Sequence, residues 1–251
     1  MNTTLVGLFA PTCTREEIRR GKNAFAQTAV WLRDAGFDAV EFHFAHGYLL
    51  AGFAAHDLNT RTDEYGGSVE NRTRFGFEVV EATRRAVGRD FPLIAKINAN
   101  VHRIVPGSSQ EETNFYVQGL ADRGCDAIKI SGRAWGLLAT DIFSKEDHNF
   151  FARDARNIAR SVNVPLILIG GVRSIKMAEE SLRHNSRLVA FGVARTILAE
   201  PDLPNKWQQD LSYDPKCIAC NWCLARIPNI TFEQIFKENA RTVCVLDQNR
   251  V

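Results

Sequence analysis

Two imidazoles and one phenol lie within six residues of this chain, at His43, His46 and Tyr48. They follow the apolar run 39–42, which predicts a β-strand, so we expect all three side chains to gather where that strand ends. Two hydrogen-bond donors beside a weak acid can polarise a carbonyl group and deliver a proton. Because a histidine near a strand end is often structural, these three residues alone leave both interpretations open.

A lysine and two glycine-containing loops also follow predicted strands. Lys96 lies at the carboxyl end of the predicted strand 93–97, where a lone lysine is ordinarily a solvated charge. A Gly-Gly pair is usually a turn, but glycines also let backbone N–H groups approach phosphate oxygens, and an arginine nearby adds positive charge. These loop residues are Gly170 and Gly171 after the run 166–169, and Gly192, Ala194 and Arg195 after the run 188–191.

Three cysteines near the end of the sequence, Cys217, Cys220 and Cys223, have Cys-x2-Cys-x2-Cys spacing. This spacing suits an iron–sulfur cluster or a metal ion. The next cysteine, Cys244, follows 21 residues after Cys223. We assign no metal ligand from the spacing alone.

The composition excludes several classes of protein. A net charge of +2 with 24% charged residues gives no nucleic-acid footprint, and 45% hydrophobic residues is ordinary for a globular chain. The first residues lack the basic region of a signal peptide, and no apolar run approaches the roughly 20 residues of a membrane helix. Six cysteines without a secretion signal argue against a disulfide framework, so we expect a reducing, cytoplasmic location.

Short apolar runs alternate with longer helical patterns along the chain. Thr14 and Glu17 form a capping box that opens the first helix, and Gly36 ends it. Alternation of this kind predicts parallel βα units with both faces of the sheet covered. The predicted strands are 39–42, 93–97, 127–130, 166–169 and 188–191, and the later helices are 71–87, 111–123, 150–162, 175–184 and 203–211.

The segment from Glu41 to Arg72 resembles the flavin-binding barrel of the Old Yellow Enzyme family, within the NADH:flavin oxidoreductases and NADH oxidases. That family carries Glu-x-His-x-Ala-(His or Asn)-Gly-Tyr-Leu-Leu, then Phe, then Asn-x-Arg-Thr-Asp-Glu-Tyr-Gly-Gly-Ser-x-Glu-Asn-Arg. Ala55 and His56 replace a Ser-Pro pair, which affects the expected loop conformation. The matching residues are Glu41, His43, Ala45, His46, Gly47, Tyr48, Leu49, Leu50, Phe53, Asn59, Arg61, Thr62, Asp63, Glu64, Tyr65, Gly66, Gly67, Ser68, Glu70, Asn71 and Arg72.

The resemblance implies an α/β fold of the (β/α)8 TIM-barrel type that is incomplete. Five strands are predicted where the barrel has eight, and the family places the first of them at the fourth barrel strand. The missing units would need about 90 residues, whereas 38 precede Ala39. We therefore expect residues 1–211 to form strands four to eight of a flavin-binding barrel and residues 212–251 to form a cysteine-containing extension.

The resemblance also implies a role for each candidate residue. His43 and His46 would bind the carbonyl oxygen of an α,β-unsaturated substrate, and Tyr48 would give a proton to its α-carbon. Lys96 would lie beside the pyrimidine edge of FMN, and NAD(P)H would be the reductant. The FMN phosphate would be bound by Gly170, Gly171, Gly192, Ala194 and Arg195.

The cysteine motif resembles that of the dienoyl-CoA reductase and trimethylamine dehydrogenase branch. Those relatives place a fourth cysteine about a dozen residues after the third and add further nucleotide-binding domains. Because Cys244 lies farther away and no such domains follow, we favour vestigial thiols over an occupied iron–sulfur cluster.

Three functions compete at this stage. The first is an FMN-dependent ene-reductase that acts on a small enone-type substrate. The second is an inactive or partner-dependent barrel fragment, which would form a homo-oligomer or bind a complementing chain and would not bind FMN alone. The third, a flavin-free phosphate-binding barrel, leaves His43, His46 and Tyr48 unexplained.

Overall fold

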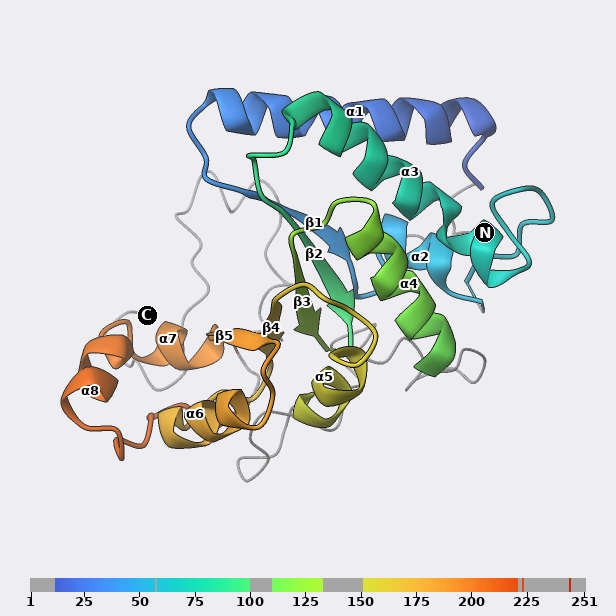
Figure 1. Cartoon of the computed structure of the whole chain (residues 1–251). Helices are drawn as coiled ribbons and strands as arrows, with labels where there is room; N and C mark the ends of the chain where they lie inside the picture. The colour runs from blue at the N-terminus through green and yellow to red at the C-terminus, as the bar shows by residue number, and fades with distance from the viewer. Residues whose placement is uncertain are drawn as a thin grey trace. The chain divides into compact units, whose positions relative to one another are not determined.

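The computed structural model describes residues 12–56, 58–99, 110–132 and 151–220, together with Cys223 and Cys244. Within these ranges five strands alternate with helices (Figure 1). None of these helices combines the length and the apolar character that crossing a bilayer requires. In chain order the elements are α1 (Arg15–Asp34), β1 (Val40–Phe44), α2 (Leu49–Ala54), α3 (Val69–Val87), β2 (Leu93–Asn98), α4 (Gln110–Asp122), β3 (Ala127–Ser131), α5 (Ala152–Ile158), β4 (Leu166–Ile169), α6 (Ile175–Arg183), β5 (Leu188–Gly192), α7 (Arg195–Ala199) and α8 (Leu203–Gln209).

The strands form one sheet in the order β1-β2-β3-β4-β5, and β1 to β4 pair in parallel. Sequential parallel strands joined by helices are the repeating unit of a (β/α)8 barrel. The described residues therefore form a partial TIM barrel, which confirms the predicted fold class.

The sequence placed most elements within a few residues and missed two short helices. Thr14 and Glu17 form the predicted capping box, and Gly36 has the left-handed φ of 87° that stops α1. The strand predicted at 39–42 instead runs from Val40 to Phe44, so the prediction that His43 follows the strand was wrong. Helices α2 and α7, which are only 6 and 5 residues long, were not predicted because short helices carry little periodicity.

The contact pattern divides the chain into two compact units. The first comprises Met1–Gly136, Phe151–Leu168 and Asn185–Ala190, and the second comprises Leu137–Phe150, Ile169–His184 and Phe191–Val251. The core of the second unit is formed by Val172, Ala178, Leu203 and Trp207. The predicted boundary at residue 211 does not coincide with this division and stays a prediction.

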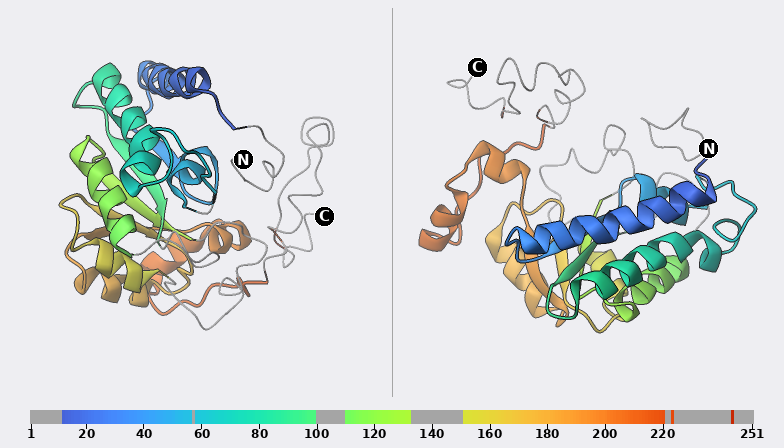
Figure 2. Two further views of the ribbon diagram at one scale, coloured as in Figure 1. Left: turned by 90° about the vertical axis from the view of Figure 1, so that its right-hand side faces the viewer. Right: turned by 90° about the horizontal axis from the view of Figure 1, so that it is seen from above.

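In the first unit, helices α3 and α4 lie side by side on one face of β1, β2 and β3, and α1 packs along α3 (Figure 2). Side chains alternate between the two faces of a strand. Phe42, Ala95 and Ile128 belong to the alternate strand positions that are buried in this unit. The intervening positions carry the polar side chains of β1, β2 and β3, so these side chains point to the opposite face of the sheet.

The family motif between Asn59 and Arg72 builds a loop through its own hydrogen bonds. The amide of Asn59 donates to the carbonyl oxygens of Phe53 at 2.7 Å and Tyr65 at 2.6 Å. The Arg61 guanidinium binds the Asp63 carboxylate, which lowers the pKa of that carboxyl group. A Cβ at Gly66 would collide with the backbone of Arg61. The motif thus specifies a loop scaffold between α2 and α3.

Replacing the buried Asn59 by alanine is expected to lower the free energy of unfolding by about 3 kcal/mol, because two carbonyl oxygens and the Arg61 N–H lose their partner. Urea unfolding followed by circular dichroism measures the change. Asn23→Ala on the exposed side of α1 is the matched control, with an expected change within about 0.5 kcal/mol. Equal stabilities of the two variants would contradict this role for Asn59.

Candidate active site

His43, His46 and Tyr48 come together at the carboxyl end of β1. His43 lies in the strand, His46 follows in a turn, and Tyr48 precedes the first residue of α2. The ring centroids of His43 and His46 are 4.9 Å apart, and those of His43 and Tyr48 are 5.0 Å apart. Tyr48 is 52% exposed. The predicted trio is therefore assembled, with its phenol open to solvent.

Two buried residues that the sequence analysis did not select hold His46 in place. The backbone N–H of His46 donates to Asn98 Oδ1 at 3.0 Å, and its ring Nε2 lies 2.8 Å from Ser131 Oγ. Asn98 ends β2 and Ser131 ends β3. Both are polar residues directly after an apolar run, the same signal that selected His43.

The pKa values of both histidines are lowered, which favours the neutral imidazole at pH 7. Burial is the main cause that lowers the pKa of His46 to about 4, and repulsion by Lys96, and by His43 when it is protonated, adds to it. Burial and the Lys96 charge also lower the pKa of His43, against a smaller opposing effect of Glu41. The backbone N–H of Ala45 donates to His43 Nδ1 at 3.3 Å, so neutral His43 carries its hydrogen on Nε2.

Lys96 lies beside His43 in the sheet and shares a carboxylate with a second lysine. The parallel register pairs His43 with Lys96 and Lys96 with Lys129. Glu41 forms ion pairs with both lysines, since Lys129 Nζ is 2.8 Å from one carboxylate oxygen and Lys96 Nζ is 3.6 Å from the other. This arrangement leaves one net positive charge beside the imidazoles. Lys129 was not singled out by the sequence.

The predicted phosphate-binding residues all lie in the second compact unit. Gly170 and Gly171 have φ values of 111° and 70°, which only glycine adopts without strain. A Cβ at Gly192 would lie 2.6 Å from Ile169 Cγ2, so this glycine permits the close packing of β4 and β5. Ala194 precedes α7, and Arg195 is its first residue. These are backbone positions suited to exposing N–H groups to an anion.

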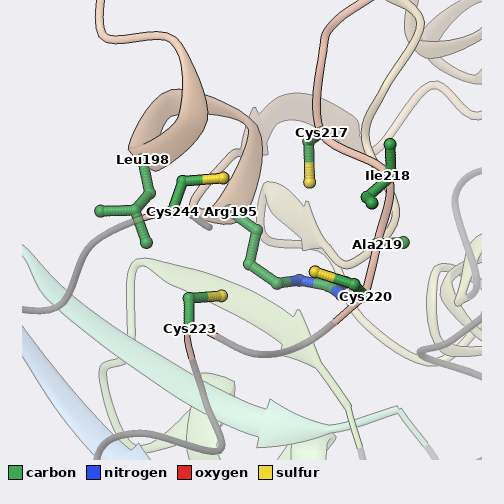
Figure 3. A pocket seen from close by; sticks show the side chains of 8 residues that line it. All are labelled: Arg195, Leu198, Cys217, Ile218, Ala219, Cys220, Cys223 and Cys244. Carbon is green, nitrogen blue, oxygen red and sulfur yellow. The ribbon is translucent and has the colours of Figure 1, made fainter. Parts of the chain in front are cut away.

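The four cysteines of the predicted extension line one pocket of the second unit (Figure 3). The Cys217, Cys220, Cys223 and Cys244 thiols point into it, and the Arg195 side chain extends toward Cys220. The buried carboxylate of Glu200 accepts from the Tyr213 hydroxyl at 2.6 Å and anchors the segment before Cys217. Among the described residues, no three His, Cys, Asp or Glu side chains are arranged to hold a metal ion.

The lowered pKa of His46 makes the stability of the protein depend on pH. Between an ordinary value of 6.5 and the folded value of about 4, the unfolded chain binds a proton that the folded chain excludes. The free energy of unfolding is therefore expected to fall as the pH decreases from 6.5, by on the order of 3 kcal/mol at pH 4. Denaturant unfolding between pH 4 and pH 8 measures this dependence.

His46→Asn should remove this part of the pH dependence, and asparagine tolerates the left-handed backbone found here. His56→Asn, which changes an exposed histidine, is the control and should keep the wild-type profile. A His46→Asn profile that parallels the wild type would contradict the assignment.

The sequence and the fold both match known flavoenzymes. The model of the NADH:flavin oxidoreductase / NADH oxidase family matches residues 2–214. The chain is 34% identical over 213 residues to a metal reductase of Desulforamulus reducens, covering 83% of this chain and 31% of that protein. It is 32% identical over 245 residues to a cinnamate reductase of Clostridium sporogenes, covering 90% of this chain and 36% of that protein.

A solved structure of a 2-naphthoyl-CoA reductase complex superposes with a TM-score of 0.76 at 26% identity, covering 84% of this chain and 32% of that one. The chain thus spans about a third of the length of these proteins. The family model, the relatives and the partial barrel agree. The chain therefore belongs to the NADH:flavin oxidoreductase / NADH oxidase family, in which FMN is the cofactor and NAD(P)H the reductant.

Proposed function

We propose that this chain carries the substrate-binding and proton-donating part of an FMN-dependent reductase of α,β-unsaturated carbonyl compounds. The observation that carries the proposal is that the His46 and Tyr48 rings both lie beside His43, at centroid distances of 4.9 Å and 5.0 Å. The chemistry that bound FMN would supply is hydride transfer from NAD(P)H to the alkene β-carbon. The residues of this chain supply the rest.

His43 and His46 bind the carbonyl oxygen of the substrate through N–H groups. Both imidazoles are neutral because their pKa values are lowered, so they act as hydrogen-bond donors and keep their protons. Withdrawal of electron density through the oxygen makes the β-carbon more electrophilic and stabilises the negative charge that develops on the oxygen. The role is positioning and electrostatic stabilisation.

Tyr48 donates a proton to the α-carbon. Its ring lies beside His43, and the side chain is 52% exposed, so a substrate bound at the imidazoles can reach the phenol. Hydride at the β-carbon and a proton at the α-carbon together give the saturated carbonyl product. Solvent then restores the proton on Tyr48.

The residues proposed for FMN fit the chemistry of that cofactor. Lys96 is paired with His43 in the parallel register. Its positive charge would stabilise negative charge on the reduced ring of bound FMN. The left-handed Gly170 and Gly171 and the first residues of α7 would offer backbone N–H groups to a phosphate, and Arg195 would add positive charge.

The names of two similar proteins favour this class of substrate. Cinnamate is an α,β-unsaturated acid, and 2-naphthoyl-CoA is an unsaturated acyl thioester. Both offer a carbonyl oxygen conjugated to a carbon–carbon double bond. The cytoplasmic location predicted from the cysteine content stays a prediction.

The second candidate is a barrel fragment that needs a partner before it binds FMN. The chain spans about a third of three similar proteins, and in the described residues β1 has a sheet neighbour on one side only. An unpaired edge of this kind can accept a further strand. In this case a second copy of the chain or a complementing chain would supply the other barrel units.

Titration of the purified chain with FMN and with riboflavin separates the two candidates. The chain is expected to bind both flavins. Arg195→Gln should lower the affinity for FMN by about 10-fold or more and leave the affinity for riboflavin unchanged, because only FMN carries the phosphate. Arg183→Gln, at a side chain 76% exposed on α6, is the control. A chain that takes up no flavin favours the partner-dependent fragment, and equal FMN affinities in both variants contradict the role of Arg195.

Tyr48→Phe is expected to slow reduction of 2-cyclohexenone by about 100-fold or more and to leave reduction of the bound flavin by NADPH unchanged. Anaerobic stopped-flow absorbance measures the two half-reactions separately. The control is Tyr116→Phe, since this buried hydroxyl has no hydrogen-bond partner in the described part of the chain. Full-rate enone reduction by Tyr48→Phe would remove Tyr48 from the proposal.

A further inference from the structure

The ends of two neighbouring strands converge on His46. Asn98 and Ser131 are paired in the parallel register of β2 and β3 and are only 4% and 6% exposed. Asn98 binds the backbone of His46, and Ser131 binds its ring. A backbone contact and a ring contact from adjacent strands fix both the direction and the rotation of the imidazole.

Asn98 stabilises an unusual backbone at His46. The φ of His46 is +60°, in the left-handed region where a residue with a Cβ is strained. Such a conformation persists where surrounding contacts hold it. The Asn98 amide oxygen accepts the His46 N–H at 3.0 Å and satisfies this donor in the strained turn.

The contact with Ser131 determines which ring nitrogen of His46 is protonated. Among the described residues, His46 Nε2 is the hydrogen-bond partner of the Ser131 hydroxyl. If Nε2 carried the hydrogen and donated it to Ser131, the buried serine O–H would have no acceptor among the described residues. A hydroxyl that donates to an unprotonated Nε2 satisfies both groups, and the hydrogen of the neutral ring then lies on Nδ1.

His43 is held in the opposite way. Because the Ala45 N–H occupies His43 Nδ1, the hydrogen of neutral His43 lies on Nε2. The two rings meet edge to face, at an interplanar angle of 82°. Each ring thus has one nitrogen occupied by a donor of the protein and keeps one N–H for an external acceptor.

We propose that Ser131 is a positioning residue that holds His46 as the Nδ1–H tautomer, opposite to His43, so that both neutral rings donate to one acceptor. The link to a substrate oxygen rests on the proposed function. The tautomer itself does not, because it is a property of the chain without substrate or flavin.

Nitrogen-15 NMR of the histidine-labelled full chain at pH 7.5 tests the proposal directly. Long-range proton–nitrogen spectra distinguish the two tautomers, and the His43→Asn and His46→Asn variants assign the signals among the six histidines. The expected result is Nδ1–H for His46 and Nε2–H for His43. A wild-type spectrum with Nε2–H at His46 would overturn the proposal without the need for any serine variant.

Two serine variants test the cause. Ser131→Ala should shift His46 toward the Nε2–H form and raise the KM for 2-cyclohexenone by about tenfold, with flavin reduction by NADPH unchanged. Ser131→Thr keeps the hydroxyl and should restore the wild-type tautomer. An unchanged tautomer in Ser131→Ala would overturn the role of Ser131. The correct tautomer in a chain that reduces no enone would leave this inference standing and contradict the proposed function.

Discussion

The parallel register of β1, β2 and β3 is the constraint on which the candidate site depends. It places His43, Lys96 and Lys129 in one row and Asn98 and Ser131 in the next, toward the carboxyl ends of the strands. A shift of one residue would turn these side chains toward the helices, because strand residues alternate between faces. The buried residues Phe42, Ala95 and Ile128 on the opposite face prevent that shift. Packing of the core thus determines which side chains lie on the other face of the sheet.

The long family motif plays a different part from the short one. His43, His46 and Tyr48 carry the side chains that can do chemistry, whereas Asn59 and Arg61 bind the backbone of α2 and groups of the loop itself. The loop joins α2, which follows Tyr48, to α3, which covers the sheet. The motif that identified the family most clearly therefore builds the loop that follows α2 and the His43–Tyr48 segment.

The sequence predicted the elements that have a strong period and the residues that match a motif. The five strands and the capped α1 were found because apolar runs and the Thr14–Glu17 pair are local signals. The assignment of His43 to a loop was wrong because a polar residue that alternates with apolar ones inside a strand resembles the first residue after the strand. Asn98 and Ser131 carry a local signal, a polar residue after an apolar run, but their contacts with His46 join residues more than fifty positions apart, which no local pattern encodes.

The charges around the imidazoles serve two requirements at once. Glu41 is shared between Lys129 and Lys96, so the row retains one net positive charge beside His43. Burial, together with this charge, lowers the pKa of both histidines and thereby favours neutral imidazoles. In the proposed function, the same field would stabilise negative charge that develops on a substrate oxygen. A protonated histidine would add a second positive charge next to Lys96, and the buried site disfavours that state. Lys96 therefore carries the fixed positive charge, and the two neutral imidazoles set the direction of the hydrogen bonds.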